Sequence, residues 1–121
     1  MSIVDRIESV LTLELVKHFL EIDHAEDDIL LPLMTGYAAE QADLFLNNEF
    51  TEVDAETGET TNLDIPNSVI IGCLMLIKDS YENRGASPVV GKRVGDMSLQ
   101  FGEPSESVLK KWRPYRKLPG L

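Results

Sequence analysis

Cysteine and histidine are scarce in this chain of 121 residues, which has one cysteine, Cys73, and two histidines, His18 and His24. A single cysteine excludes an internal disulfide and a cysteine-based zinc site. Cys73 lies in the most apolar segment, where a thiol packs as a small, unreactive hydrophobe. The histidines are not spaced as a metal-binding pair on one helix. His24 and its acidic neighbours are better explained as the solvated start of a helix than as a weak divalent-ion site, so we predict no metal site.

Long hydrophobic runs are also absent. The longest, Val69 to Ile77, is well short of the roughly 18 residues that a membrane span needs. The first ten residues mix acids with apolar side chains and lack the basic start and apolar centre of a signal peptide. We therefore expect no membrane contact and a protein that stays in the cytoplasm. The length fits one domain over residues 1–121, and the apolar fraction, 43%, is typical of globular proteins.

Basic residues are few in the first two thirds of the chain. Residues 1–77 hold sixteen acids and two bases, a sum of −14, whereas residues 78–121 sum to +4. So acidic a chain does not bind duplex DNA through a broad basic face. Opposite charges at the two ends could join copies head to tail, and such contacts close into a ring when the rotation between subunits permits. The alternative is that the body is acidic for solubility and the tail is basic by chance.

Helical periodicity dominates what is present. The sequence predicts a mainly α fold, a small bundle of three to four helices with one or two β-hairpins or long loops. Residues 1–11 stay open between a short helix and an arm. The predicted helices span about residues 12–22, 24–48, 66–84 and 105–113, with loops at 49–65 and 85–104 and an extended tail at 114–121.

Local signals place the ends of these elements. Thr12 is a predicted N-cap, and Asp23 with Glu26 has the form of a capping box that would start the second helix. Pro32 should kink that helix or mark its true first turn. Pro66 fits the first position of the third helix. Gly58 favours a turn between two short strands.

Two stripes of side chains have helical spacing. The stripe in the second helix predicts a core face of mostly large residues, and small residues beside it allow a neighbouring helix to approach closely. The large residues are Leu30, Leu33, Met34, Tyr37, Gln41, Leu44 and Phe45. The small ones are Gly36, Ala38, Ala39 and Ala42. The third helix is apolar nearly all round from Val69 to Ile77, which indicates a central helix packed on more than one side.

No catalytic motif is present. The chain has no Gly-x-Ser-x-Gly element and no defensible Ser-His-Asp order. The stretch GASPVVGK contains Gly85, Gly91 and Lys92, but its spacing is not that of a phosphate-binding loop. We predict no enzymatic activity, no catalytic residue and no cofactor.

The basic C-terminal stretch allows three interpretations. Its bases with Trp112 and Tyr115 could contact nucleic acid through phosphates and stacking. They could anchor the chain to a partner protein, because Trp, Tyr and Arg dominate interface hot spots. The segment could also fold back on its own core and bury Trp112. The acidic body makes nucleic acid the weakest of the three.

In the order and wording of its helical segments, the chain resembles the small head–tail connector proteins of tailed bacteriophages, the adaptors beneath the portal. The resemblance rests on LTLELVKHFLEID, AEDDILLPLM with the alanines that follow, LMLIKDSYENRG and LKKWRPYR, in that order over about residues 11–117. The segment Thr51 to Asp64 departs from it, because it is longer than the usual link between the second and third helices. We leave its role open, and one interpretation is a contact that is specific to one virus.

The resemblance implies a structural virion protein, assembled in the host bacterial cytoplasm, whose copies form a ring that is dodecameric in the virion. The ring would dock on the portal protein, extend the DNA channel and offer its far face to the next head-completion or tail protein. DNA would pass through the lumen without specific binding. An acidic DNA-mimic inhibitor of a DNA-binding enzyme is the alternative, although the basic tail and glycine-rich loop argue against it.

Three groups of residues receive roles on this basis. The end of the third helix is a predicted subunit interface, at Tyr81, Glu82, Asn83 and Arg84. The glycine-rich loop is predicted to line the lumen or clasp a neighbour, through Lys92, Arg93 and Asp96. The tail is predicted to dock on the portal, through Lys110, Lys111, Trp112, Arg113, Tyr115, Arg116 and Lys117.

Overall fold

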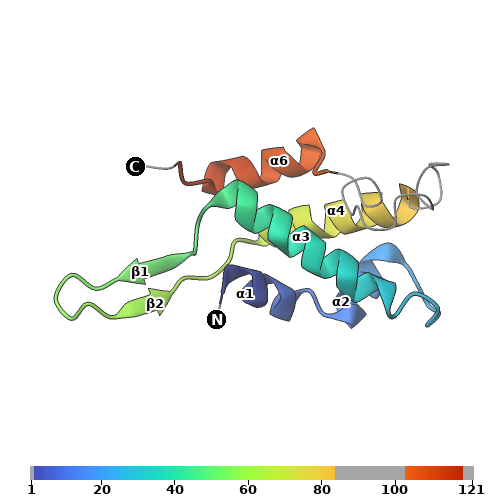
Figure 1. Ribbon diagram of the computed structural model, residues 1–121, viewed down its shortest axis with the longest axis horizontal. Coiled ribbons are helices and arrows are strands. Elements are labelled where there is room, and N and C mark those ends of the chain that lie inside the picture. The colour runs from blue at the N-terminus through green and yellow to red at the C-terminus, as the bar shows by residue number, and fades with distance from the viewer. Residues whose placement is uncertain (1, 84–102, 119–121) are drawn as a thin grey trace.

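The computed structural model describes residues 2–83 and 103–118, which form helices and one hairpin (Figure 1). The helices are α1 (Ile3–Val10), α2 (Leu13–Leu20), α3 (Leu30–Leu46), α4 (Asn67–Asn83) and α6 (Glu106–Trp112), followed by a 3-10 turn, η2 (Arg113–Tyr115). Strands β1 (Thr51–Val53) and β2 (Thr60–Asn62) pair antiparallel. The predicted mainly helical class with a hairpin is therefore confirmed.

Helix α3 is the centre of the arrangement. It packs against α4, with α1 and α2 along one side and α6 on the other, and the hairpin projects from one end of the body (Figure 1). Within the described residues, no helix combines the length and apolar character needed to cross a membrane.

The segment that the sequence left open, residues 1–11, supplies helix α1. Ser2 caps it, since the Ser2 hydroxyl accepts a hydrogen bond from the Asp5 backbone N–H at 3.1 Å and the Asp5 carboxylate accepts one from the Ser2 N–H at 3.3 Å. This reciprocal pair is a capping box. Ile3 and Ile7 are buried in the core, and α1 packs on α3.

The expected start of the second long helix at Asp23 is wrong, because α3 begins at Leu30. The acids before it are engaged elsewhere. Asp28 pairs with Lys17 of α2 at 2.8 Å, and the Asp27 carboxylate accepts a hydrogen bond from Tyr81 of α4. Pro32 therefore falls in the first turn of α3, where a missing N–H costs nothing. The stretch 24–29 is a turn that links three helices.

Other boundaries lie close to the predictions. Thr12 caps α2 through a hydrogen bond from the Leu15 N–H, and Ser105 caps α6 through one from the Val108 N–H. Helix α4 starts one residue after Pro66. The tail is corrected in part, because Arg113 to Tyr115 form a 3-10 turn before the chain becomes extended at Arg116. The second possible hairpin, at 86–104, lies largely outside the described residues.

Helix α4 is buried on several sides, as its apolar run predicted. Seven apolar or small residues in its first three turns are buried: Val69, Ile70, Gly72, Cys73, Leu74, Leu76 and Ile77. The Cys73 thiol donates to the Ala38 carbonyl of α3 at 3.9 Å, and its burial raises the pKa to about 12. The thiol is therefore protonated and unreactive at neutral pH.

The stripe of large residues in α3 predicted a buried face of large side chains. The face that is buried contains more small residues than this prediction. Ala38, Ala39 and Ala42 are fully buried, while Leu33 and Leu44 are 57% and 75% exposed. Small side chains let the backbones of α3 and α4 approach closely. Leu33 and Leu44 lie nearly opposite Ala42 around the helix, so they face solvent. The predicted close helix contact is confirmed, but the large residues at Leu33 and Leu44 are not part of the core.

Trp112 at the end of α6 is the largest fully buried side chain. Its ring lies over Gly72 of α4, and its Nε1–H donates to the Val69 carbonyl at 3.1 Å. Phe45 of α3 packs beside it, with ring centroids 6.2 Å apart. A β-carbon at position 72 would lie only 2.2 Å from the Trp112 Nε1 atom. Glycine at this position is therefore what allows α6 to dock on α4.

We expect Gly72→Ala to destabilise the protein by about 1–3 kcal/mol, because the added methyl group overpacks the site of Trp112. Gly36→Ala is the matched control, since a β-carbon there meets only a Glu8 carboxylate oxygen at 3.9 Å. That control should gain about 0.5–1 kcal/mol through helix propensity. Urea unfolding of both variants checks the pair, and equal stabilities would contradict the proposed packing.

Candidate interaction surfaces

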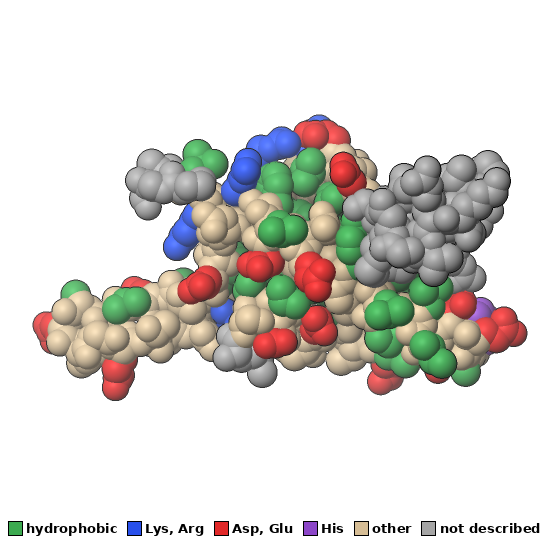
Figure 2. Space-filling view, in the orientation of Figure 1, with side chains coloured by type: hydrophobic (Ala, Val, Ile, Leu, Met, Phe, Trp, Pro, Cys, Tyr) green, Lys and Arg blue, Asp and Glu red, His purple; other side chains and the backbone are tan. Residues whose placement is uncertain are grey.

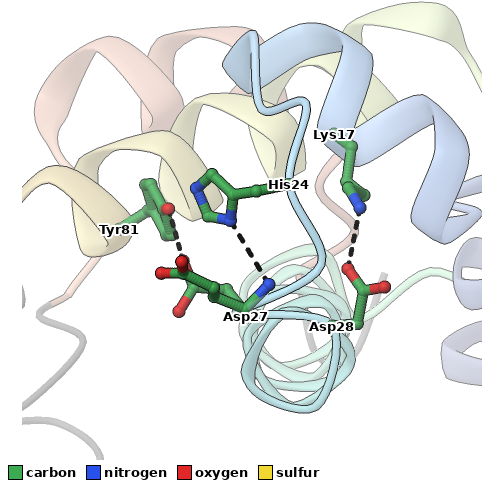
Figure 3. Close-up of polar contacts among 6 residues, drawn as sticks. Lys17, His24, Asp27, Asp28 and Tyr81 are labelled. Carbon is green, nitrogen blue, oxygen red and sulfur yellow. Dashed lines mark hydrogen bonds and ion pairs between the residues drawn. The ribbon is translucent and has the colours of Figure 1, made fainter.

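The end of α4 was the predicted subunit interface, and the structure shows what its residues do within one chain. Tyr81 is half-buried, and its hydroxyl donates to the Asp27 carboxylate at 2.5 Å (Figure 3). Asn83 is exposed, and its side-chain amide donates to the Asp79 carbonyl at 2.8 Å. Glu82 is exposed, and Arg84 lies outside the described residues. Tyr81 therefore fastens the turn before α3, while Glu82 and Asn83 face solvent.

Asp79, just before the last turn of α4, has a raised pKa. Partial burial raises the pKa of its carboxyl above the ordinary value of 3.8, the charge of Glu82 raises it further, and Lys78 opposes the shift. The ionised form of Asp79 is therefore less favourable in the folded protein than in the unfolded chain.

The turn between α2 and α3 is held from both sides (Figure 3). Lys17 reaches Asp28 from α2, Tyr81 reaches Asp27 from α4, and His24 Nδ1 accepts a hydrogen bond from the Glu26 backbone N–H at 3.3 Å. Across residues 2–83 and 103–118, no cluster of three or more His, Cys, Asp or Glu side chains could hold a metal ion. An open depression nearby is lined by Leu13, Glu14, Lys17, His18, Ile22 and Asp23.

The basic C-terminal segment folds onto its own core at Trp112, which is the third of the interpretations considered above. This corrects the expectation that the Trp112 side chain is available for a partner, because the ring is fully buried. Tyr115 is half-buried and packs near Phe50, with ring centroids 6.5 Å apart. The exposed members of the predicted docking group are the bases, Lys110, Lys111, Arg113, Arg116 and Lys117.

The segment after η2 is tied to the end of α3. The Lys117 N–H donates to the Leu46 carbonyl at 2.8 Å, and the Asn47 and Asn48 side-chain amides donate to the Lys117 and Tyr115 carbonyls at 3.2 and 2.8 Å. The Arg116 guanidinium carbon lies 4.7 Å from the centre of the Phe45 ring, within cation–π range. The segment is thus placed on the body as far as residue 117.

The root of the hairpin is held by Arg6 of α1. Its guanidinium donates to the Glu49 and Phe50 carbonyls at 2.8 and 3.2 Å and to the Leu63 carbonyl at 2.5 Å. The Arg6 guanidinium therefore holds both the segment before β1 and the segment after β2, at the point where the hairpin leaves the helical body. The Leu63 N–H also donates to the Phe50 carbonyl at 2.8 Å, and Phe50 itself is buried.

Sequence reasoning gave no role to Arg6. Contacts with carbonyls of residues more than forty positions away leave no periodic or motif signal. The available signal was composition, since Arg6 is one of two bases among sixteen acids in residues 1–77. The predicted loop residues Lys92, Arg93 and Asp96 lie outside the described part of the chain.

The comparisons with known proteins agree with this architecture. The model of the phage gp6-like head-tail connector protein family matches residues 10–116, so the chain belongs to that family. It is therefore a structural protein of the phage virion, of a class that is not enzymatic. Neither the curated proteins nor the solved structures gave a significant match. Most of α1, including Arg6, precedes the matched region.

We expect Arg6→Ala to loosen the hairpin root by about 1–3 kcal/mol, because three carbonyls lose a charged donor. Hydrogen exchange of the amides in Thr51 to Asn62 should accelerate, while the amides of α4 should keep their protection. Arg6→Lys is the control. It retains the positive charge but lacks the planar guanidinium group, which binds the segments before β1 and after β2 at the same time. Unchanged exchange in Arg6→Ala would show that the clamp is dispensable.

We expect Asp79→Asn to raise the melting temperature slightly at pH 7. The raised pKa means that the folded state loses stability relative to the unfolded chain as the pH rises from 3.8 through the higher folded value. Removing the charge removes that loss, so the gain should shrink as the pH approaches 3.8. Thermal unfolding of both proteins across this range is the measurement. A gain that stays constant with pH would assign the effect to another cause.

Proposed function

We propose that copies of this protein assemble into a ring that docks on the portal, continues the DNA channel and carries the next head-completion or tail protein on its far face. The observation that carries this proposal is the match to the head-tail connector family over residues 10–116. A dodecameric ring on the portal is the form that we propose for the virion.

Charge supports the assembly. Two surfaces of opposite sign lie on different parts of the same chain, and this favours a heterologous contact in which each copy offers one surface to each neighbour. Figure 2 displays acidic side chains over the body and the hairpin, with basic side chains gathered along the edge formed by α6 and the tail. Such contacts weaken as salt screens them.

Charge also supports passage of DNA. The chain carries a formal net charge of −10. A channel built from copies of so acidic a protein repels phosphates, which lets the duplex slide without binding. An acidic DNA-mimic inhibitor would share the net charge, but the family match favours the connector.

We propose that the end of the tail, with Arg116 and Lys117, faces the portal. Both side chains are exposed, and hydrogen bonds to the end of α3 fix the backbone that carries them. Trp112 belongs to the core, so a truncation before it would unfold α6 and could not test docking. Charge reversal at Arg116 and Lys117 leaves Trp112 in place and is the sharper change.

Electron microscopy of heads with an exposed portal, mixed with the purified protein, tests the proposal. We expect ring density at the portal vertex with the wild-type chain, and weaker occupancy with Arg116→Glu combined with Lys117→Glu. The control is Glu26→Lys combined with Glu40→Lys, which alters exposed acids of the body. A wild-type protein that neither self-associates nor decorates the portal vertex would refute the proposed function.

A further inference from the structure

The hairpin of β1 and β2 stands clear of the helical body (Figure 1). Thr51 is half-buried, while the other five strand residues are exposed. Each strand has one neighbour only, so each outer edge carries backbone groups that no strand of the described chain covers. An isolated two-stranded hairpin is marginally stable in water. Its exposure therefore indicates a surface that another molecule covers.

The register of the strands gives the hairpin two different faces. Glu52 lies opposite Thr61, and Glu59 precedes Thr61 by two positions, so Glu52 and Glu59 share one face. The opposite face carries Val53 and Thr60, which are uncharged. Residues 50–65 contain five acids and no base. One face of this arm is therefore acidic.

Within residues 2–83 and 103–118, the acids of the hairpin form no ion pair. Across the described residues the ion pairs join Lys17 with Asp28 and Arg113 with Glu106, and neither involves the hairpin. Arg6 binds the segments before β1 and after β2, which holds the root of the hairpin against the body. A neighbouring molecule with exposed cations would therefore find these carboxylates available for pairing.

Helix α6 offers such cations. Lys110 and Lys111 are exposed on the solvent side of α6, while Val108 and Trp112 point into the core. Neither lysine forms an ion pair with any described residue, in contrast to Arg113, whose guanidinium lies 3.0 Å from a Glu106 carboxylate oxygen. The pair forms an unsatisfied cationic surface on a rigid helix.

We propose that the acidic face of the hairpin of one copy docks on α6 of the next copy, with Glu52 and Glu59 facing Lys110 and Lys111. The occupant is a second copy of this chain, because the same sequence supplies both charges. The contact joins two different surfaces, so it repeats around a closed ring. It rests on the proposed ring assembly and names the surfaces that make it. Lys110 and Lys111 are thereby assigned to the neighbouring subunit, while the end of the tail remains with the portal.

Charge exchange tests this contact directly. One variant carries Glu52→Lys and Glu59→Lys, and the other carries Lys110→Glu and Lys111→Glu. Each alone places like charges opposite one another between identical copies, so assembly should require roughly tenfold more protein or fail. In a mixture, a ring in which the two variants alternate has opposite charges at every contact, so we expect the mixture to assemble like the wild type. The experiment is run in solution at low salt and on portal-bearing heads.

Two controls separate this contact from total charge. Glu26→Lys with Glu40→Lys changes the net charge as much as the hairpin variant does, but on the body, and should assemble normally. Thr60→Lys with Asn62→Lys adds charge to the opposite face of the same hairpin and should also assemble normally. Normal assembly of Glu52→Lys with Glu59→Lys, or a mixture that stays as defective as its components, would overturn the proposal.

Cross-linking provides a second measurement that does not depend on the strength of assembly. Glu59→Cys and Lys110→Cys are placed on separate chains with different tags, and native Cys73 stays silent because its thiol is buried. A cross-linked pair carrying both tags is expected in wild-type-like assemblies, and its absence from intact rings would refute the docking while leaving the connector function standing. A wild type that assembles nowhere would instead refute the proposed function, and this inference with it.

Discussion

The close contact between Trp112 and the backbone of α4 is the constraint on which the rest of the fold depends. The ring is fully buried over Gly72, and its Nε1–H donates to the Val69 carbonyl. This contact joins the C-terminal part of the chain to the central helix. Phe45 of α3 completes the site, so α3, α4 and α6 meet around one indole. The exposed lysines of α6 and the basic tail take their positions from this buried contact.

The local elements were largely predictable from the sequence, because their signals lie within a few residues. Thr12 and Ser105 cap the helices that they were expected to cap, and the turn near Gly58 forms a hairpin. The prediction failed where distant partners decide the local structure. The acids before Leu30 bind Lys17 and Tyr81, so they do not start the helix.

The candidate surfaces were less predictable than the elements. A basic tail could be seen in the sequence, but whether Trp112 was an anchor or a core residue depended on a glycine forty positions earlier. Periodicity in α3 favoured a stripe of large residues as the buried face, whereas the face that is buried carries the alanines and lies opposite Leu33 and Leu44. Arg6 acts on backbone carbonyls, which every residue possesses, so its partners carry no signature in the side-chain pattern.

The attachment of the tail to the end of α3 has a mechanical consequence. The carbonyls of Tyr115 and Lys117 are held by Asn48 and Asn47, immediately before the root of the hairpin. Tension on the tail would therefore be transmitted first to this short linker and then to the hairpin.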